Sequence, residues 1–199
     1  MQSLPARLDG HQPGETPTAL RLRPMSTDTL TPADTTTQPA TVLDNGLAWQ
    51  ANLQTGDGRM DDTHEEFVDM LNRILQTPMR DHLPLYREFL AHTVEHFAQE
   101  ERWMVATGFS PDNCHASHHN TILDTMRAVE EHYLKGDNEI IQRLAEALAE
   151  WFPQHAASMD AGLAQHMKNV GFDSHTETLA DPDAIRPATM SGCGSVSCS

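Results

Sequence analysis

The chain has 199 residues, of which 38% are hydrophobic and 21% are charged, and its formal net charge is -16. That length is sufficient for one ordinary domain with some chain left over. The strong negative charge argues against nucleic acid or an anionic membrane surface as a partner, because both would repel the protein. Twelve histidines stand against thirteen lysines and arginines, an unusual ratio that suggests metal binding.

The sequence also indicates the cellular location of the protein. No apolar run is long enough to cross a membrane. The N-terminus lacks the basic-then-apolar pattern of a signal peptide, and Asp9 and Glu15 are untypical of a transit peptide. Three cysteines are too few for a disulfide framework. We therefore expect a soluble, cytoplasmic protein.

The two ends of the chain differ in composition from its middle. Residues 1–43 are rich in threonine, proline and small polar residues and show no hydrophobic period, which predicts a disordered arm. Residues 173–199 are similar and predict a disordered tail. Cys193 and Cys198 in this tail could form a disulfide, bind a soft metal or have no role, and we favour the last interpretation. Residues 44–172 are expected to form the folded domain.

This middle region contains four segments with an apolar side chain every three or four residues, the period of an amphipathic helix. Capping residues, prolines and glycines place the ends of these four segments at about 61–77, 81–107, 111–136 and 137–170. Ser110 followed by Pro111 predicts an N-cap and a first helical position for the third segment. Because the connections are short, neighbouring helices should run antiparallel. The sequence therefore predicts an all-α, up-down-up-down four-helix bundle with disordered tails.

The apolar faces of these helices also carry side chains that ionise. They are His64, His96, Glu100, His115, His119 and His155. Burying such groups without partners would cost about several kcal/mol each. Either a polar network or a metal must therefore compensate for their burial.

The spacing of these side chains favours a metal. His96 and Glu100 are four residues apart, as are His115 and His119, so each pair points from one face of its helix. Two side chains placed in this way can reach the same ion.

The fourth helix has a less regular spacing. His155 and Asp160 are five residues apart, which corresponds to about 140° around an ideal helix. They can converge only if the helix is wound differently there or the side chains lean towards each other. Pro153 removes one backbone hydrogen bond just before them, which favours a local distortion.

Together these positions offer five imidazoles and two carboxylates, a set that suits iron, manganese or zinc. Seven ligands are too many for one tetrahedral zinc, whereas two ions bridged by carboxylates would use them all. The absence of any Glu-x-x-His sequence excludes the ferritin-like plan. A single residue such as His64 would more often be an ordinary core histidine, but contributions from four helices are poorly explained in that way. Four further histidines are interpreted as surface or supporting residues: His92, His118, His132 and His166.

Over residues 44–172 the chain resembles the hemerythrin family, in particular the bacterial single-domain hemerythrins. The resemblance lies in DDTHEEFVDMLNRI around His64, in HFAQEERWM with His96 and Glu100, in HASHH with His115 and His119, and in HAASMD with His155 and Asp160. The GFSP stretch also resembles the turn that the family has between its second and third helices.

The resemblance implies a role for each of these residues. His115, His119 and His155 would ligate one iron, and His64 with His96 the other. Glu100 and Asp160 would bridge the two irons together with an oxo or hydroxo group. The iron with two histidines would keep an open position for O2. Candidates for an apolar wall around that position, each equally compatible with ordinary core packing, are Phe67, Leu71, Phe97 and Trp103.

The function implied is reversible O2 binding at a non-haem di-iron centre, for storage, buffering or delivery to an oxygen-consuming protein, without enzymatic turnover. One alternative is a di-iron sensor of O2 or redox state, although no signalling domain is visible. Another is an enzyme, such as a peroxidase or an activity on nitric oxide or iron. The sequence sets neither the oxygen affinity nor the oligomeric state.

Overall fold

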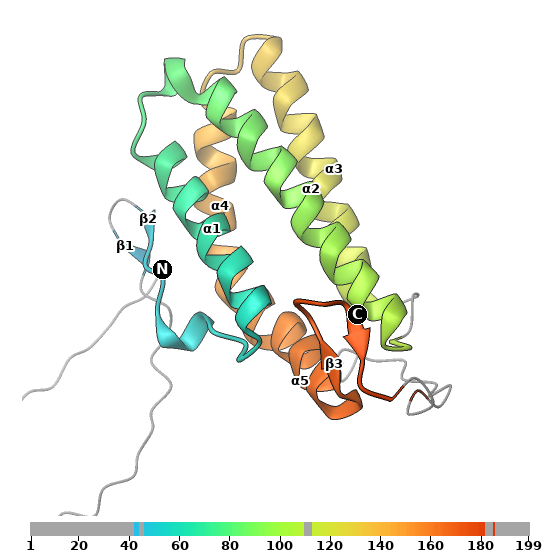
Figure 1. Cartoon of the computed structure of the whole chain (residues 1–199). Coiled ribbons are helices and arrows are strands. Elements are labelled where there is room, and N and C mark those ends of the chain that lie inside the picture. Colours follow the sequence, from blue (N-terminus) through green and yellow to red (C-terminus); the bar gives the residue numbers. More distant parts are fainter. Residues whose placement is uncertain (1–41, 44–45, 110–112, 182–184, 186–199) are drawn as a thin grey trace, which may run out of the picture. The chain divides into compact units, whose positions relative to one another are not determined.

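A computed structural model describes residues 42–43, 46–109, 113–181 and 185, and its long helices pack side by side as a bundle (Figure 1). The helical elements are α1 (Gly58–Leu75), α2 (His82–Ala106), α3 (Cys114–Leu134), α4 (Ile140–His155), η3 (Ala156–Asp160) and α5 (Ala161–Val170). The last three follow one another without a break, so they form a single fourth helical segment. The predicted all-α four-helix bundle is confirmed.

Helices that are consecutive in the chain pack against each other, and the first also packs against the fourth. α1 packs against α2 and α4, and α3 packs against the same two helices. The connections are short: η2 (Met79–Asp81) joins α1 to α2, and five residues separate α3 from α4. This is the up-down-up-down arrangement that short connections favour.

Side-chain caps fix where two of the helices begin. The Asp57 carboxylate accepts a hydrogen bond from Met60 N at 3.0 Å at the start of α1. At the start of α3 the amide oxygen of Asn113 accepts one from Ala116 N at 2.9 Å. The N-cap predicted at Ser110 is wrong, because α3 begins at Cys114 and its N-cap is Asn113. Asparagine caps helices as well as serine does. Ser110 and Pro111 themselves lie outside the described residues.

The bundle interior contains two apolar clusters. The first includes Phe67, Leu71, Phe89, Met126, Leu148 and Phe152. The second includes Met60, Trp103, Met104, Leu163, Met167 and Phe172. Along α1, Met60 belongs to the second cluster and Phe67 to the first, and the buried His64 lies between them. The ionisable side chains of the interior therefore lie between two apolar layers.

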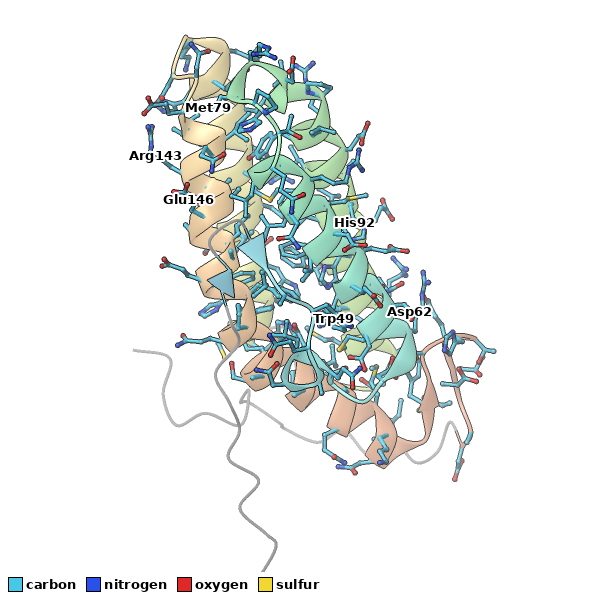
Figure 2. All side chains as sticks on the ribbon, turned by 90° about the vertical axis from the view of Figure 1, so that its left-hand side faces the viewer. Trp49, Asp62, Met79, His92, Arg143 and Glu146 are labelled. Carbon is cyan, nitrogen blue, oxygen red and sulfur yellow. The ribbon has the colours of Figure 1, made fainter. Side chains whose placement is uncertain are left out.

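A short N-terminal hairpin crosses the outside of the bundle in front of α1 and of α4, which carries Arg143 and Glu146 (Figure 2). β1 (Val42–Leu43) pairs antiparallel with β2 (Gly46–Leu47), and the single turn η1 (Ala51–Leu53) follows.

The Asn72 side chain holds this hairpin on α1. Its Oδ1 accepts from Leu47 N at 2.8 Å, and its Nδ2 donates to Leu47 O at 2.8 Å. Gly46 has a φ of 142°, and a Cβ there would clash with Asn72 Oδ1, so only glycine permits this approach. Leu47 and Leu53 are each 1% exposed within the first apolar cluster, against which Trp49 packs. The segment therefore completes the core on the α1–α4 side.

The chain folds further past the fourth helical segment than the sequence predicts. β3 (Phe172–Asp173) pairs antiparallel with β4 (Thr178–Leu179), and Phe172 is buried in the second apolar cluster. Ser174 Oγ donates to Asp57 Oδ1 at 2.8 Å. Residues 173–181, which the sequence places in a disordered tail, thus pack on the bundle.

At the N-terminal side, Val42 and Leu43 likewise form a strand within the range predicted as a disordered arm. The other residues of that arm and the tail residues Cys193 and Cys198 lie outside the described residues. Among the described helices, none combines the length and the apolar character needed to span a membrane.

Candidate metal centre

All seven ionisable side chains singled out in the sequence converge between the two apolar clusters, and each is at most 4% exposed. Their ligating atoms form two groups, in each of which the atoms lie within 4.8 Å of one another. The larger group consists of His115, His119, His155 and Asp160, and the smaller of His64, His96 and Glu100.

Helix geometry explains how the fourth helical segment contributes two of these side chains. Residues Ala156–Asp160 are wound as a π-helix, and Ala161 N–H donates to Ala156 O, five residues earlier. This wider winding brings His155 and Asp160 onto one face despite their spacing of five. Pro153 cannot donate to the carbonyl four residues before it, which loosens the helix at this point. The local distortion predicted from Pro153 is confirmed.

Glu100 lies between the two groups of histidines. Its Oε1 is 2.9 Å from His96 Nε2 and 3.6 Å from His64 Nε2. Its Oε2 is 3.1 Å from His115 Nε2 and 3.5 Å from His119 Nε2. One oxygen of this carboxylate therefore faces each group.

Asp160 lies between the same two groups. Its Oδ2 is 3.3 Å from His64 Nε2. Its Oδ1 is 2.8 Å from His115 Nε2 and 3.2 Å from His155 Nε2. Two carboxylates thus each present one oxygen to the pair and one to the trio of histidines, an arrangement that can hold two cations side by side.

Several of these close atoms do not form hydrogen bonds with one another. Among the described residues, no hydrogen-bond partner exists for His64 Nε2, His115 Nε2, Glu100 Oε2 or either Asp160 oxygen. Buried polar atoms without partners are rare in folded proteins and need an explanation. A cation between them would supply one, and imidazole with carboxylate and no thiolate suits iron, manganese or zinc. The residues present therefore fit a di-iron centre.

The carboxylates of this site are held in their charged form. Burial alone would raise the pKa of Glu100, but close contacts with the imidazoles of His115 and His64 hold that pKa well below its usual range. Burial and the charge of Glu100 would also raise the pKa of Asp160, but His155 and His115 hold it below its usual range. Both side chains can therefore serve as anionic ligands.

The histidines differ in charge. Burial lowers the pKa of His119 to about 3, so its imidazole is neutral at ordinary pH. For His115 burial acts in the same direction, but contacts with Asp160 and Glu100 outweigh it and raise the pKa to about 9. A cation that binds through His115 must displace its proton, because only the neutral imidazole is a ligand.

Aromatic rings lie close to the smaller group of ionisable side chains. The Phe97 ring is centred 5.2 Å and the Phe67 ring 6.0 Å from the ring of His96. Leu71 belongs to the first apolar cluster with Phe67. Trp103 belongs to the second cluster, and its place in the wall of an oxygen pocket stays a prediction.

Sequence reasoning missed an aromatic ring beside His64. Phe152 meets His64 edge-on with ring centroids 5.1 Å apart, and it stacks on Phe67 at 4.7 Å. Its signal was its place three residues before His155 on the same apolar face.

Four histidines expected at the surface or in supporting places lie outside both groups: His92, His118, His132 and His166. His92 is half-buried on α2, with Nδ1 3.7 Å from Glu66 Oε2. His118 and His132 are exposed, and half-buried His166 forms a hydrogen bond with Thr107 O at 3.0 Å.

The chain is similar to known proteins of one family. The family model described as "Hemerythrin HHE cation binding domain" matches residues 55–166, which include all seven converging side chains. A bacteriohemerythrin of Ralstonia nicotianae is 34% identical over 134 residues, which cover 67% of this chain and 98% of that protein. A bacteriohemerythrin of Aquifex aeolicus is 29% identical over 114 residues, or 54% of this chain and 87% of that protein. One of Pseudomonas aeruginosa is 24% identical over 127 residues, or 62% and 82%.

Proposed function

Because the chain belongs to the hemerythrin family, we propose that its two ligand groups hold two iron ions and that this centre binds O2 reversibly. The biological role proposed is oxygen storage, buffering or delivery, and delivery would require an oxygen-consuming protein partner.

The placement of Glu100 and Asp160 is the observation that carries this proposal. Each carboxylate faces both histidine groups, so each can bridge two ions. His115, His119 and His155 would complete one side of the centre, and His64 with His96 the other. An oxo or hydroxo bridge would supply further negative charge against the two cations.

The unequal number of histidines indicates where O2 would bind. The side with His64 and His96 offers one imidazole fewer than the other side, so its ion would have an open position. Two ferrous ions bound here would supply that position and the electrons for O2 binding.

The protein places buried aromatic rings beside this side of the centre. Phe152 packs against His64, and Phe67 and Phe97 pack against His96. These rings are at most 2% exposed and carry no group that could donate a proton. Exclusion of water and proton donors favours release of O2 over its irreversible reduction.

An oxygen cycle tests the proposal. The protein is loaded anaerobically with ferrous iron, iron is counted per chain, and the visible spectrum is followed as O2 is admitted and then removed with argon. An absorption band that appears with O2 and disappears under argon supports reversible binding. Irreversible conversion to the oxidised state would contradict it and favour a sensor or an enzyme. Oxidation of an added donor by hydrogen peroxide would then identify an enzyme.

A further inference from the structure

The five histidines of the centre share an unusual environment at their second ring nitrogen. Within the described part of the chain, the Nδ1 atoms of His64, His96, His115, His119 and His155 are buried and have no hydrogen-bond partner. Metal-binding histidines almost always donate this N–H to a carboxylate, a carbonyl or water, which fixes the orientation of the ring and makes it a stronger ligand. Because no protein acceptor among the described residues performs that task, the rings must be oriented by water or by packing.

Aromatic rings stack on two of the three histidines in the larger group. The Phe97 ring stacks on His119 with centroids 3.8 Å apart and planes at 3°. The Trp151 ring stacks on His155 with centroids 4.3 Å apart and planes at 25°. A ring this close to the face of an imidazole blocks rotation about the bond that joins the imidazole to Cβ. Each stack thereby holds the plane of one imidazole and the direction of its Nε2.

We propose that Phe97 and Trp151 are positioning residues of the metal centre, which orient His119 and His155 by stacking in place of hydrogen bonds to Nδ1. This inference rests on the proposed function. Its consequence is that the larger ligand group depends on aromatic packing for its metal affinity.

Phe97 and Phe89 form a matched pair with which to test this role. Both are buried phenylalanines of α2, at 2% and 1% exposure. Phe89 has one ring contact among the described residues, with Phe67 at 4.8 Å, and touches no ligand ring. Phe97→Leu and Phe89→Leu should therefore lose comparable folding stability, because both leave a similar cavity.

The probe is Co2+, whose visible spectrum responds to the geometry of its ligands. Removing a group that orients a metal ligand typically weakens binding about 10-fold to 100-fold. We expect Phe97→Leu to weaken Co2+ binding by about 10-fold and to alter the spectrum. Phe89→Leu should keep the affinity and spectrum of the unaltered protein. Unchanged Co2+ binding in Phe97→Leu, or an equal loss in both variants, would overturn the role of Phe97.

Trp151 allows a second test with little risk to folding, because its side chain is only half-buried. Trp151→Phe retains a flat ring over His155, whereas Trp151→Leu removes it. We expect the phenylalanine variant to keep the Co2+ spectrum and affinity and the leucine variant to lose both in part. Equal behaviour of the two variants would overturn the role of Trp151.

The nitrogen environment can be measured directly in the protein loaded with Zn2+ and labelled with 15N at histidine. Nδ1–H resonances at the positions of groups without hydrogen bonds support the inference, and strongly downfield resonances would overturn it. If the unaltered protein binds neither Co2+ nor Zn2+, the proposed function itself fails. Normal binding in the unaltered protein and in Phe97→Leu would defeat only the positioning role.

Discussion

His155 and Asp160 lie five residues apart in one helical segment, yet His155 Nε2 is 3.2 Å from Asp160 Oδ1. In an ideal α-helix these side chains would point about 140° apart. The π-helical winding of Ala156–Asp160 removes that difference. One irregular turn thus places the second carboxylate between the two histidine groups.

Shortening this turn should preserve iron binding, whereas lengthening it should reduce the iron content. Deleting exposed Ser158 leaves His155 and Asp160 four residues apart, the spacing of His96 and Glu100, so we expect an α-helical turn that still loads two irons. Inserting an alanine after Ala157 rotates Asp160 by about a further 100°, so iron should fall below two per chain. Elemental analysis after anaerobic loading and desalting measures both. Equal iron contents in the two variants would refute this explanation.

The neighbours His118 and His119 provide a test of the ligand assignment. His119 is buried in the larger ligand group, whereas His118 is exposed and lies outside it. His119→Ala should therefore lower the iron content, and His118→Ala should leave it unchanged. Iron analysis and the visible spectrum of each loaded variant decide the matter. Unaltered iron content and spectrum in His119→Ala would disprove the assignment.

Asn72 should contribute to folding through the N-terminal hairpin. Asn72→Ala removes two 2.8 Å hydrogen bonds and leaves the backbone of Leu47 without these partners. We expect a loss of about 1–3 kcal/mol in the free energy of unfolding. Asn169→Ala, at an exposed side-chain hydrogen bond of α5, should change it by no more than about 0.5 kcal/mol. Urea unfolding measures both, and equal losses would argue against the role of Asn72.

Tyr86 should make stability depend on alkaline pH. Its hydroxyl donates to Met126 O at 2.7 Å, and burial, followed by the charge of Glu130, raises its pKa. The folded protein therefore keeps this proton at pH values where the unfolded chain, with a pKa of about 10, has lost it. This contribution is complete below about pH 10 and declines as the pH rises further.

Tyr86→Phe lacks both the hydrogen bond and this titration. It should be less stable by about 0.5–1.5 kcal/mol at neutral pH. The difference from the unaltered protein should shrink as the pH rises above about 10. Urea unfolding of both proteins at several pH values measures this difference in stability. A difference that stays constant with pH would show that the Tyr86 hydroxyl does not cause the pH dependence.

The regular parts of the fold and of the site could be predicted because they depend on spacing within one helix. His96 and Glu100, and likewise His115 and His119, follow the α-helical period and point inward in the structure. Pro153 indicated a distortion, but its form as a π-helical turn depends on how the segment packs against its neighbours.

Contacts between distant segments could not be predicted in the same way. Ser174 reaches Asp57 across 117 positions of sequence, so the folding of residues 173–181 leaves little local signal. The edge-on contact of Phe152 with His64 likewise joins two helices that only the bundle brings together. The cap at Asn113 was missed for another reason, because two good capping residues lie within one short connection.

The central claim is that Glu100 and Asp160 are shared by two metal ions, and the magnetic coupling of bound iron tests it most directly. The protein is loaded with ferrous iron, oxidised, analysed for iron and examined by electron paramagnetic resonance and Mössbauer spectroscopy. Two ferric ions joined by these bridges should couple antiferromagnetically, giving two irons per chain and no resonance from isolated high-spin ferric iron. One iron per chain, or an isolated ferric signal that accounts for all the iron, would contradict the account.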